Sequence, residues 1–589
     1  MGSTTEPGKQ VDARTVLAEC PLFAGLNHDA VDRLAAEAQA VRLEAGETLF
    51  AAGDVAETLY IVATGRLRAI FPDGRIAGDI ARLEPLGEIG LLTGDRRSAS
   101  VHALRDSLLF AFSRKSFHAF AMGEPAAFMA ITKVIIDRMR EPGRETRLRA
   151  ARKIRTLAVL AATPEVDGPA FAAQLDDALG GNTLLIGHEH AERAGLADNL
   201  DALHAWMSQL EFTHKQVIYD ATGPTNWIRA VLRQADRILV VADATAAASP
   251  AFACDALQAA DPRSSIELVL LRREGDGALC TLSWKAELRA QSHYFVRPNH
   301  AADISSLARQ LTGYGVGLVL GGGGARGFAH VGLIRALNEL KISVDVCGGA
   351  SMGAYIAALH ASGRDVQNIT EALQDTFMRR KLLNDYRLPF VSLIAGQKFR
   401  RHLHSVFGDL RIEHMGTPFF CVSTNLTHAR AEVHNEGVVA DWLAASMCIP
   451  GLAPPVAWQG SLLCDGAVVN SLPTDVMQNL GRGVIVASDV SNEGAIAAPH
   501  AQGPDPDFLA VHKRHADGRR VSLKDVLFRT TSLGSESGMA ARAERADLYL
   551  RMPVGHIGTF DWPLFDDIIQ RGYEFAMEKL PPLLEKLEP

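Results

Sequence analysis

The sequence predicts a multidomain α/β protein that begins with a β-barrel, and three features of the chain support this prediction. Its 589 residues are too many for one hydrophobic core. Short β-rich segments separated by turns fill the N-terminal part, and strands alternate with helices in the remainder. We expect a disordered N-terminus, a barrel, a basic helical linker and two α/β domains, over residues 1–13, 14–140, 141–155, 156–310 and 314–589.

The composition excludes several classes of protein. Apolar residues make up 47% of the chain and charged residues 22%, as is usual for soluble globular proteins. The net charge of −8 and the pI of about 6.2 predict that no nucleic acid is bound. The seven cysteines are scattered without a CxxC pair, which predicts buried thiols in a reducing compartment and no metal site.

The polar opening stretch, MGSTTEPGKQVDA, predicts a disordered end and no secretory signal. The sequence contains no uninterrupted run of about 18 apolar residues, so no segment is expected to span a bilayer. We therefore expect a cytoplasmic protein whose membrane contact, if it has any, is peripheral and at the inner face.

The barrel is predicted from short strands separated by turns at Gly46, Gly53, Gly65 and Asp73-Gly74. The stretch LEAGETLFAAGDVAETLYIVATGRLRAIF resembles the jelly-roll fold of cyclic-nucleotide-binding domains. This resemblance implies a phosphate-binding cassette between residues 87 and 101, with cAMP or cGMP as an effector. No metal-ligand cluster is visible in the sequence, so we expect that no cofactor is required.

Within that cassette, the resemblance assigns three residues to the nucleotide. Arg97 would pair with the cyclic phosphate, Glu88 would accept a hydrogen bond from the ribose hydroxyl, and Ser98 would also touch the phosphate. The alternative is a cassette that only keeps the shape of the barrel, in which Arg97 pairs with Glu88 or Glu57.

A basic run follows on a helical pattern. It contains Arg138, Arg140, Arg144, Arg147, Arg149, Arg152, Lys153 and Arg155. Such a run is usually a solvated helix face, and the alternative is contact with anionic lipid headgroups.

Residues 156–310 are predicted to form an open parallel α/β layer, from β-branched or leucine-rich runs at 182–187, 216–220, 237–243 and 266–271. Asp220 and Asp243 end two of these runs, where such sheets bind ligands. The sequence contains no G-x-x-x-x-G-K-[ST], so we expect a spacer or docking domain that does not hydrolyse nucleotides.

The most informative stretch lies in the last domain, between residues 315 and 353. An apolar strand leads into the glycine tract 321–324, and a helix follows. A second strand, through Val344 and Val346, ends in Gly349-Ala350-Ser351-Met352-Gly353. A serine in G-x-S-x-G between a strand and a helix is the nucleophile elbow, in which glycines permit a turn that exposes the hydroxyl.

Two other interpretations of this stretch are open. Gly322-x-Gly324-x-x-Gly327 also fits a dinucleotide fingerprint, but no acidic residue ends the second strand to bind a ribose. Ser351 could also be a helix N-cap beside a glycine-rich turn.

GGGGARGFAHVG followed by GGASMG resembles the patatin-like phospholipase family, and Asp465-Gly466-Ala467 resembles its third motif. With the barrel, the whole chain resembles bacterial relatives of neuropathy target esterase. The resemblance implies that Ser351 attacks an ester carbonyl while Asp465 takes its proton. It also implies that the oxyanion hole is formed by Gly322, Gly323, Gly324 and Arg326, where Arg326 adds positive charge or fixes the loop.

A Ser–Asp–His hydrolase is the conventional competitor. Its histidine would follow Asp465 in the chain, and the candidates are His500, His512, His515 and His556. No late histidine stands in a recognisable turn after a strand, which favours the dyad.

Residues 378–408 mix basic and apolar groups, which predicts either a lid or lipid-facing element or a packed helical insert. For the whole chain, the resemblance implies a serine hydrolase of phospholipids or lysophospholipids that a cyclic nucleotide could regulate. The alternative is a nucleotide-responsive binding or scaffold protein whose hydrolase fold is silent.

Overall fold

The computed structural model describes residues 11–23, 27–123, 154–180, 183–273, 275, 279–380, 382–388, 390–491 and 523–587. The chain forms two compact units, Met1–Thr312 and Gly313–Pro589, called here the N-terminal and C-terminal units. Most of the basic run lies outside the described residues, as do His500, His512 and His515. The first helix begins at Ala13, with Asp12 as its N-cap, so it includes the last residue of the segment predicted to be disordered.

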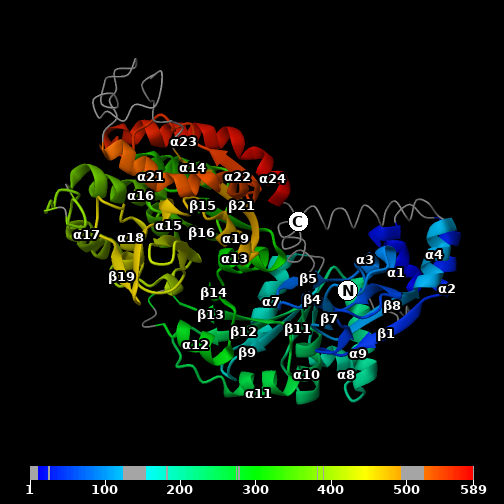
Figure 1. Ribbon diagram of the computed structural model, residues 1–589. Helices are drawn as coiled ribbons and strands as arrows, with labels where there is room; N and C mark the ends of the chain where they lie inside the picture. Colours follow the sequence, from blue (N-terminus) through cyan, green and yellow to red (C-terminus); the bar gives the residue numbers. More distant parts are fainter. Residues whose placement is uncertain are drawn as a thin grey trace. The chain divides into compact units, whose positions relative to one another are not determined.

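Two four-stranded antiparallel sheets form the predicted barrel, in the orders β1-β8-β3-β6 and β2-β7-β4-β5 (Figure 1). The strands are β1 (Gln39–Leu43), β2 (Thr48–Phe50), β3 (Thr58–Thr64), β4 (Leu67–Ile70), β5 (Ile76–Ile80), β6 (Pro85–Leu86), β7 (Ser100–Ala103) and β8 (Ser107–Ser113). The helices are α1 (Ala13–Glu19), η1 (Pro21–Phe23), α2 (His28–Ala36), α3 (Glu88–Thr93) and α4 (Arg114–Gly123).

Side chains along β3 alternate between the two hydrophobic cores of the barrel. Leu59 and Ile61 pack in one core with residues of α1, α2 and α4. Val62 points the other way and packs against Leu67 and Val101. This period of two is what a strand buried on both faces requires.

The rest of the N-terminal unit is a parallel sheet of order β10-β11-β9-β12-β13-β14 between two layers of helices. Its strands are β9 (Thr156–Ala161), β10 (Thr183–Ile186), β11 (Gln216–Asp220), β12 (Arg237–Asp243), β13 (Ser265–Leu271) and β14 (Ser292–Val296). Its helices are α7 (Gly168–Leu179), α8 (His188–Arg193), α9 (Leu200–Thr213), α10 (Thr225–Gln234), α11 (Ala251–Ala260), α12 (Thr281–Leu288) and α13 (Ala301–Thr312). The sequence did not predict β9 or β14.

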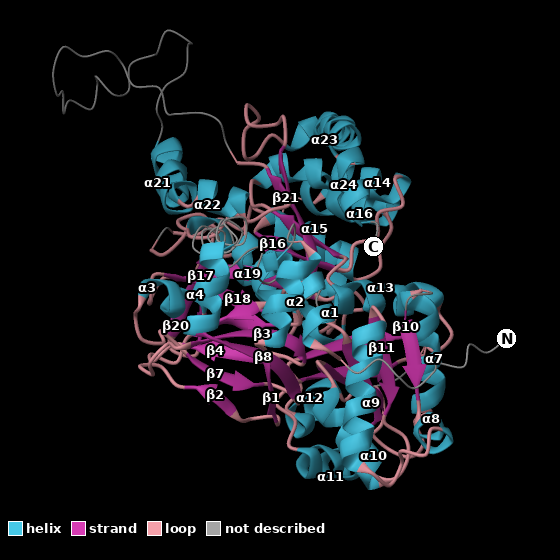
Figure 2. Ribbon diagram, turned by 90° about the vertical axis from the view of Figure 1, so that its right-hand side faces the viewer, coloured by secondary structure: helices cyan, strands magenta, loops and turns pink. Residues whose placement is uncertain are grey.

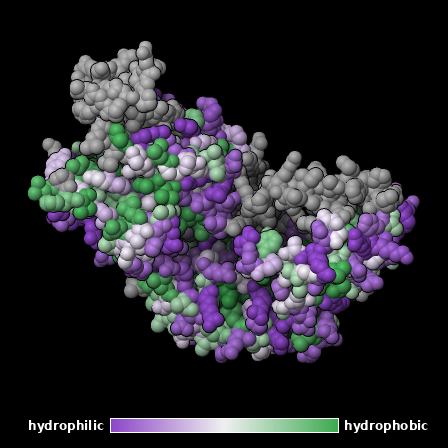
Figure 3. Space-filling view, viewed as in Figure 1, coloured by the Kyte–Doolittle hydropathy of each residue, from purple (hydrophilic) through white to green (hydrophobic). Residues whose placement is uncertain are grey.

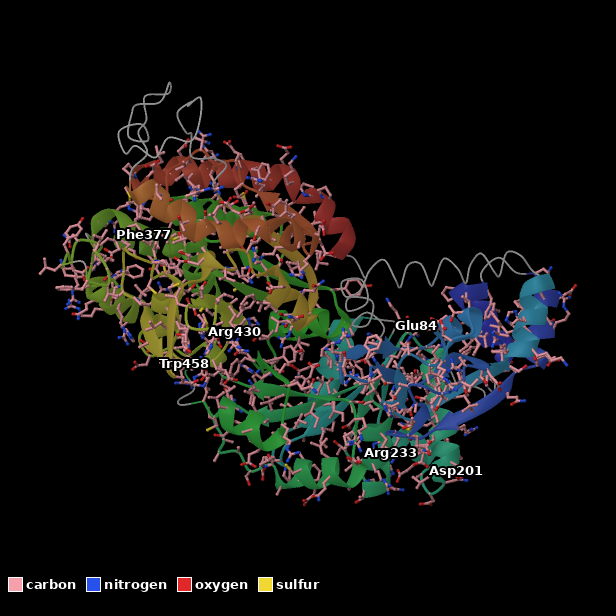
Figure 4. The ribbon with its side chains drawn as sticks, viewed as in Figure 1. Glu84, Asp201, Arg233, Phe377, Arg430 and Trp458 are labelled. Carbon is pink, nitrogen blue, oxygen red and sulfur yellow. The ribbon has the colours of Figure 1, made fainter. Side chains whose placement is uncertain are left out.

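A buried ion network joins the barrel to this sheet. Arg105, in the β7–β8 turn, donates both terminal nitrogens to Glu211 of α9 at 2.8 and 2.6 Å, and its Nε to Asp236 at 2.7 Å. The three side chains are at most 2% exposed. Beside them, Arg233 of α10, labelled in Figure 4, bonds Asp106 at 3.0 Å. The barrel and the middle domain are therefore connected by charge pairs that water cannot replace.

The C-terminal unit is an eight-stranded mixed sheet of order β19-β20-β17-β16-β15-β21-β22, with β18 paired to β17. Its strands are β15 (Gly315–Leu320), β16 (Val346–Ala350), β17 (Phe419–Asn425), β18 (Arg430–His434), β19 (Val456–Trp458), β20 (Ser461–Asp465), β21 (Gly483–Asp489) and β22 (Leu548–Arg551). The prediction that the second strand includes Val344 was wrong, because β16 begins at Val346.

Helices cover both faces of this sheet. They are α14 (Ala329–Glu339), α15 (Met352–Ala361), α16 (Val366–Leu373), α17 (Gln397–Phe407), α18 (Val439–Ser446), α19 (Thr474–Leu480), α21 (Leu523–Ser537), α22 (Met539–Glu544), α23 (Phe565–Lys579) and α24 (Pro581–Leu587), with short helices η2 (Gly324–Phe328), η3 (Gln374–Arg379), η4 (Ile412–His414), η5 (Gly466–Val468) and η6 (Trp562–Leu564). Figure 2 shows α19, α21 and α22 on one side of β21 and β16, and α14, α15 and α23 on the other.

Candidate active site

The turn after β16 has the strained geometry of a nucleophile elbow. Ser351 has φ of 53° and ψ of −125°, a backbone conformation that non-glycine residues rarely adopt. A Cβ at Gly349 or Gly353 would overlap the carbonyl oxygen of Leu320, so the two glycines allow the elbow to close against the end of β15. The helix α15 begins at the next residue, Met352.

The antiparallel strand β20 delivers the carboxylate. Its last residue, Asp465, lies opposite Ser423 of β17, and Ala350 of β16 lies opposite the preceding residue, Val422. A Cβ at Gly466 would overlap the carbonyl oxygen of Val422, so only glycine lets the chain cross β17 this closely. The strand register and this crossing bring Asp465 to Ser351 from 114 residues away.

The two side chains meet directly. Ser351 Oγ donates to Asp465 Oδ2 at 2.7 Å, and the Ala467 amide donates to Oδ1 at 2.8 Å. Burial raises the pKa of Asp465 to about 6, although both hydrogen bonds act to lower it. A carboxylate with this pKa is a better proton acceptor near neutral pH than one with an ordinary pKa.

Ser446, which sequence analysis quoted only as part of a family-like segment, supports the elbow. Its Oγ accepts the amide hydrogen of Ser351 at 3.0 Å and donates to the carbonyl of Val422 at 2.7 Å. The side chain is fully buried. The Ser351 amide is therefore occupied, and the serine backbone is fixed to β17.

The backbone amides of the glycine tract differ in whether they already donate a hydrogen bond. The Gly322 amide donates to the Ser471 carbonyl at 3.0 Å, and a Cβ at Gly322 would lie 3.1 Å from the Cβ of Ser351. In the part of the chain that the structure describes, no hydrogen-bond partner is present for the amides of Gly323 and Gly324. An oxyanion at either of these two amides would therefore displace no existing hydrogen bond.

Arg326 takes the loop-fixing role of the two that the sequence allowed. Its Nε donates to the Val490 carbonyl at 2.8 Å and one terminal nitrogen donates to the Ile557 carbonyl at 2.9 Å. The side chain is buried, and its desolvation lowers the pKa of the guanidinium. Arg326 thus holds η2 to the segments after β21 and β22.

A buried histidine that the sequence analysis missed supports the same loop. His330 Nε2 lies 2.9 Å from the Gly321 carbonyl, and Nδ1 lies 2.9 Å from Ser488 Oγ. Burial lowers its pKa to about 4, so the ring is neutral at physiological pH, donates to Gly321 and accepts from Ser488. The only signal in the sequence was a polar residue on the apolar face of a helix.

The late histidines do not complete a triad in the described ranges. His556 is exposed, and no histidine among the described residues hydrogen-bonds Ser351 or Asp465. The other three candidates lie outside those residues. The described geometry is that of the dyad.

In the barrel, Arg97 is turned inward at the cassette. Its terminal nitrogens donate to the carbonyls of Gly87 at 3.0 Å and Thr58 at 2.6 Å, and the guanidinium lies 4.2 Å from the ring centre of Phe50. Among the described residues no carboxylate lies within ion-pair distance of Arg97, and its buried Nε has no hydrogen-bond partner. The predicted pairing with Glu88 or Glu57 is therefore not formed in this structure.

The other two cassette residues differ in exposure. Glu88 begins α3 and is 2% exposed, whereas Ser98 is exposed. Desolvation lowers the pKa of Arg97. A buried guanidinium with no carboxylate at ion-pair distance is a state that an anionic ligand would stabilise. Across the described ranges, no group of three or more His, Cys, Asp or Glu residues could hold a metal ion.

Three parts of the chain match known families. Residues 318–477 match the patatin-like phospholipases, 40–124 match the cyclic nucleotide-binding domain, and 153–310 match the P-loop like domain of the Neuropathy Target Esterase (NTE) family. The chain therefore contains a patatin-like phospholipase domain, beside domains of the other two kinds. The predicted family and fold class are thereby confirmed.

Several relatives match this chain over most of its length. Over 92% of its length the patatin-like chain is 29% identical to the lysophospholipase NTE1 of Mycosarcoma maydis and 30% identical to a lysophospholipase nte1 of Aspergillus niger. It spans 34% and 42% of those two proteins. An uncharacterised NTE family protein of Mycobacterium tuberculosis (strain CDC 1551 / Oshkosh) is 29% identical over 95% of both chains.

Solved structures similar to the barrel include the regulatory domain of Toxoplasma gondii PKA with cAMP (27% identity, 20% of this chain and 46% of that one, TM-score 0.18). Another is the N-terminal domain of a transcriptional regulator from Streptomyces coelicolor A3(2) (30% identity, 21% and 92%, TM-score 0.19). Within the described residues of the patatin-like chain, no helix is long and apolar enough to cross a bilayer.

The pKa of Asp465 predicts a pH dependence for any ester hydrolysis that uses this carboxylate as its base. Because a base must be ionised and its pKa is raised to about 6, kcat/KM should rise through about pH 6 and level off above pH 7. A pH–rate profile on a non-ionising ester measures this. The variant His556→Ala should give the same profile, and a shifted midpoint in that variant would point to a histidine base.

Proposed function

We propose that the chain is a serine hydrolase of lipid esters, with lysophospholipids or phospholipids as its substrate class and a cyclic nucleotide as an effector. The observation that carries the proposal is the 2.7 Å hydrogen bond from Ser351 Oγ to a buried carboxylate of raised pKa, at a strained elbow. A helix N-cap serine would instead accept a hydrogen bond from the first turn of its own helix, and Ser351 makes no such cap bond.

In the proposed acylation, Ser351 Oγ attacks the ester carbonyl carbon while Asp465 accepts the hydroxyl proton. The carbonyl π electrons move to the oxygen, which the amides of Gly323 and Gly324 receive. When the tetrahedral intermediate collapses, the C–O bond to the alcohol breaks and Asp465 returns the proton to the leaving oxygen. The acyl group is then esterified to Ser351.

Deacylation repeats the cycle with water. Asp465 takes a proton from water as the oxygen attacks the acyl carbon, and Ser351 leaves with that proton to release the fatty acid. Ala467 and Ser446 support this sequence because they hold the carboxylate and the serine backbone in place throughout. Two fungal relatives are named lysophospholipases, which favours a single-chain lipid as substrate.

The test combines a fluorophosphonate probe with a panel of lysophospholipids and diacyl phospholipids. The full chain should be labelled at Ser351 and should release fatty acid, and Ser351→Ala should do neither. A folded wild-type chain that is neither labelled nor active on the panel would favour the scaffold alternative.

The nucleotide proposal rests on the buried Arg97, which has no carboxylate within ion-pair distance in the described part of the barrel. We expect Arg97→Met to weaken cAMP or cGMP binding at least ~10-fold in calorimetry, because a charge-assisted phosphate contact is lost. Arg96→Met is the matched control, because Arg96 is the neighbour of Arg97 in the chain. The Arg96 side chain is exposed and donates to the Gly53 carbonyl. Equal binding by wild type and Arg97→Met would refute the assignment. A wild type that binds neither nucleotide would favour the shape-only cassette.

A further inference from the structure

The loop between η3 and α17 exposes large hydrophobic side chains in the C-terminal unit. Tyr386 is 77% exposed, Leu388 74%, Phe390 90%, Val391 67% and Leu393 49%. Figure 3 shows hydrophobic side chains gathered at the edge of the molecule beside α17. Single exposed hydrophobic residues are ordinary on a protein surface, but five within eight positions of one loop form an apolar patch that marks an interaction site. We call this set the apolar loop.

The backbone of the apolar loop is held in place. Tyr386 and Ile394 form an isolated antiparallel β-bridge. The amides of Leu393 and Ile394 donate to the carbonyls of Gly451 and Leu452, respectively, at 2.9 Å each. Ser392 and Ile394 are buried, whereas Val391 and Leu393 between and beside them are exposed. This alternation shows that the same segment buries one face and presents the other to solvent.

Both ends of the loop are connected to the helix that carries the elbow. Tyr355 of α15 hydrogen-bonds Thr376 of η3 at 2.9 Å, and Thr376 hydrogen-bonds His402 of α17 at 2.8 Å. Phe377, labelled in Figure 4, stacks on Trp562 with ring centres 4.8 Å apart and contacts the ring of Tyr355. The apolar loop is therefore fixed to the same structural element as Ser351.

The residues around the apolar loop carry positive charge, which indicates the kind of surface that the loop binds. Residues 378–401 contain seven Lys or Arg and one Asp, in a chain whose net charge is −8. Among the described residues, Arg387, Lys398 and Arg401 are exposed and have no carboxylate within ion-pair distance. Apolar side chains rimmed by cations match a lipid surface with anionic headgroups, in which the side chains enter the acyl region and the cations remain at the headgroups.

We propose that the apolar loop docks the C-terminal unit onto an anionic lipid surface, from which Ser351 takes its substrate. The second part of this statement rests on the proposed hydrolase function, and the docking itself does not. The basic rim makes a second copy of this loop a less favoured occupant, because a two-fold contact would bring two positively charged rims together. A protein groove is also less favoured, because it need not carry the negative charge that an anionic bilayer always has.

The test is co-sedimentation of the full chain with vesicles of phosphatidylcholine alone or mixed with phosphatidylglycerol. Wild type should pellet with the mixed vesicles. The double variant Leu388→Ser/Phe390→Ser should bind them at least ~10-fold more weakly, because two exposed apolar side chains no longer enter the bilayer. Leu533→Ser, at a site 52% exposed on α21, is the matched control and should bind as wild type.

Two further measurements separate docking from catalysis. Ser351→Ala should still pellet, and the double variant should hydrolyse a soluble monomeric ester at the wild-type rate while losing activity on vesicles. Arg387→Glu should weaken binding to mixed vesicles only. Pelleting of the double variant at the wild-type level, or a wild-type oligomer that the double variant dissociates, would overturn the proposal. Vesicle binding without any esterase activity would leave the docking intact and reject the hydrolase.

Discussion

Ser351→Ala is expected to lower kcat/KM for lipid-ester hydrolysis at least ~1,000-fold while the chain remains folded. The substitution removes only the oxygen that donates to Asp465 at 2.7 Å and that the proposed mechanism uses as the nucleophile. Asp465→Asn should cause a loss of similar size, because an amide cannot take the proton from the hydroxyl. Since the two side chains act as one unit, the double variant should be no slower than either single variant. Initial rates on a lysophospholipid measure all three.

The effect of Asp465→Asn on the free energy of unfolding has a predictable direction. Burial raises the folded-state pKa of Asp465 to about 6 from 3.8, so the stability it contributes is present below pH 4 and is lost as pH rises through 6. At pH 7 the ionised carboxylate therefore costs up to about 3 kcal/mol, and asparagine should unfold no more easily than wild type.

Three controls accompany this series. His556→Ala should keep wild-type activity, because His556 is exposed and hydrogen-bonds neither dyad residue. The same result is expected for alanine at His512 and His515. A loss of activity in any of these variants, with unchanged folding, would replace the dyad by a triad.

The dyad could be predicted from the sequence because each half carries a local signature. A side chain at either glycine beside Ser351 would overlap the backbone of Leu320, and one at the glycine after Asp465 would overlap the backbone of Val422. The glycines of both sequence motifs are therefore required by packing. The partners of the elbow carry no such signature. Ser446 and His330 act through contacts 95 and 9 residues away, with Ser351 and with Gly321, and the packing of helices α18 and α14 brings them there.

The fold shows the same division between local and non-local information. The bounds of β11 and β12 match the prediction because valine, isoleucine and tyrosine dominate those runs. The central strand β9 was missed since its alanines and leucines suit a helix equally well. The edge strand β14 was missed because Ser292 and His293 interrupt its apolar pattern. These two segments form strands because they pair with neighbouring strands of the sheet, although their own residues do not clearly favour a strand.

The charges that join the barrel to the middle domain were also invisible in the sequence, and they carry the largest stability prediction. Arg105→Met should lower the free energy of unfolding of the N-terminal unit by roughly 3–5 kcal/mol, because buried Glu211 would lose its ion-pair partner and buried Asp236 would keep only Arg66, at 4.0 Å. Burial opposes the charge of Asp236, yet Arg105 and Arg66 lower its pKa below the ordinary value, so the carboxylate is ionised and depends on these cations.

Hydrogen exchange of the full chain measures this loss and localises it. Peptides from β3, β8, α9 and β12 should lose protection together, whereas peptides from β15 and β16 should not change. Arg233→Met is the matched control, since the side chains of Arg233 and Asp106 are 15% and 16% exposed, against at most 2% in the Arg105 network, and their loss should cost only about 1 kcal/mol. Adding Glu211→Gln and Asp236→Asn to Arg105→Met should recover part of the loss, because neutral amides are less costly to bury than lone carboxylates. If Arg105→Met instead unfolds the barrel alone and leaves α9 protected, the charge network does not couple the two domains, and the barrel is then free to move when its cassette is occupied.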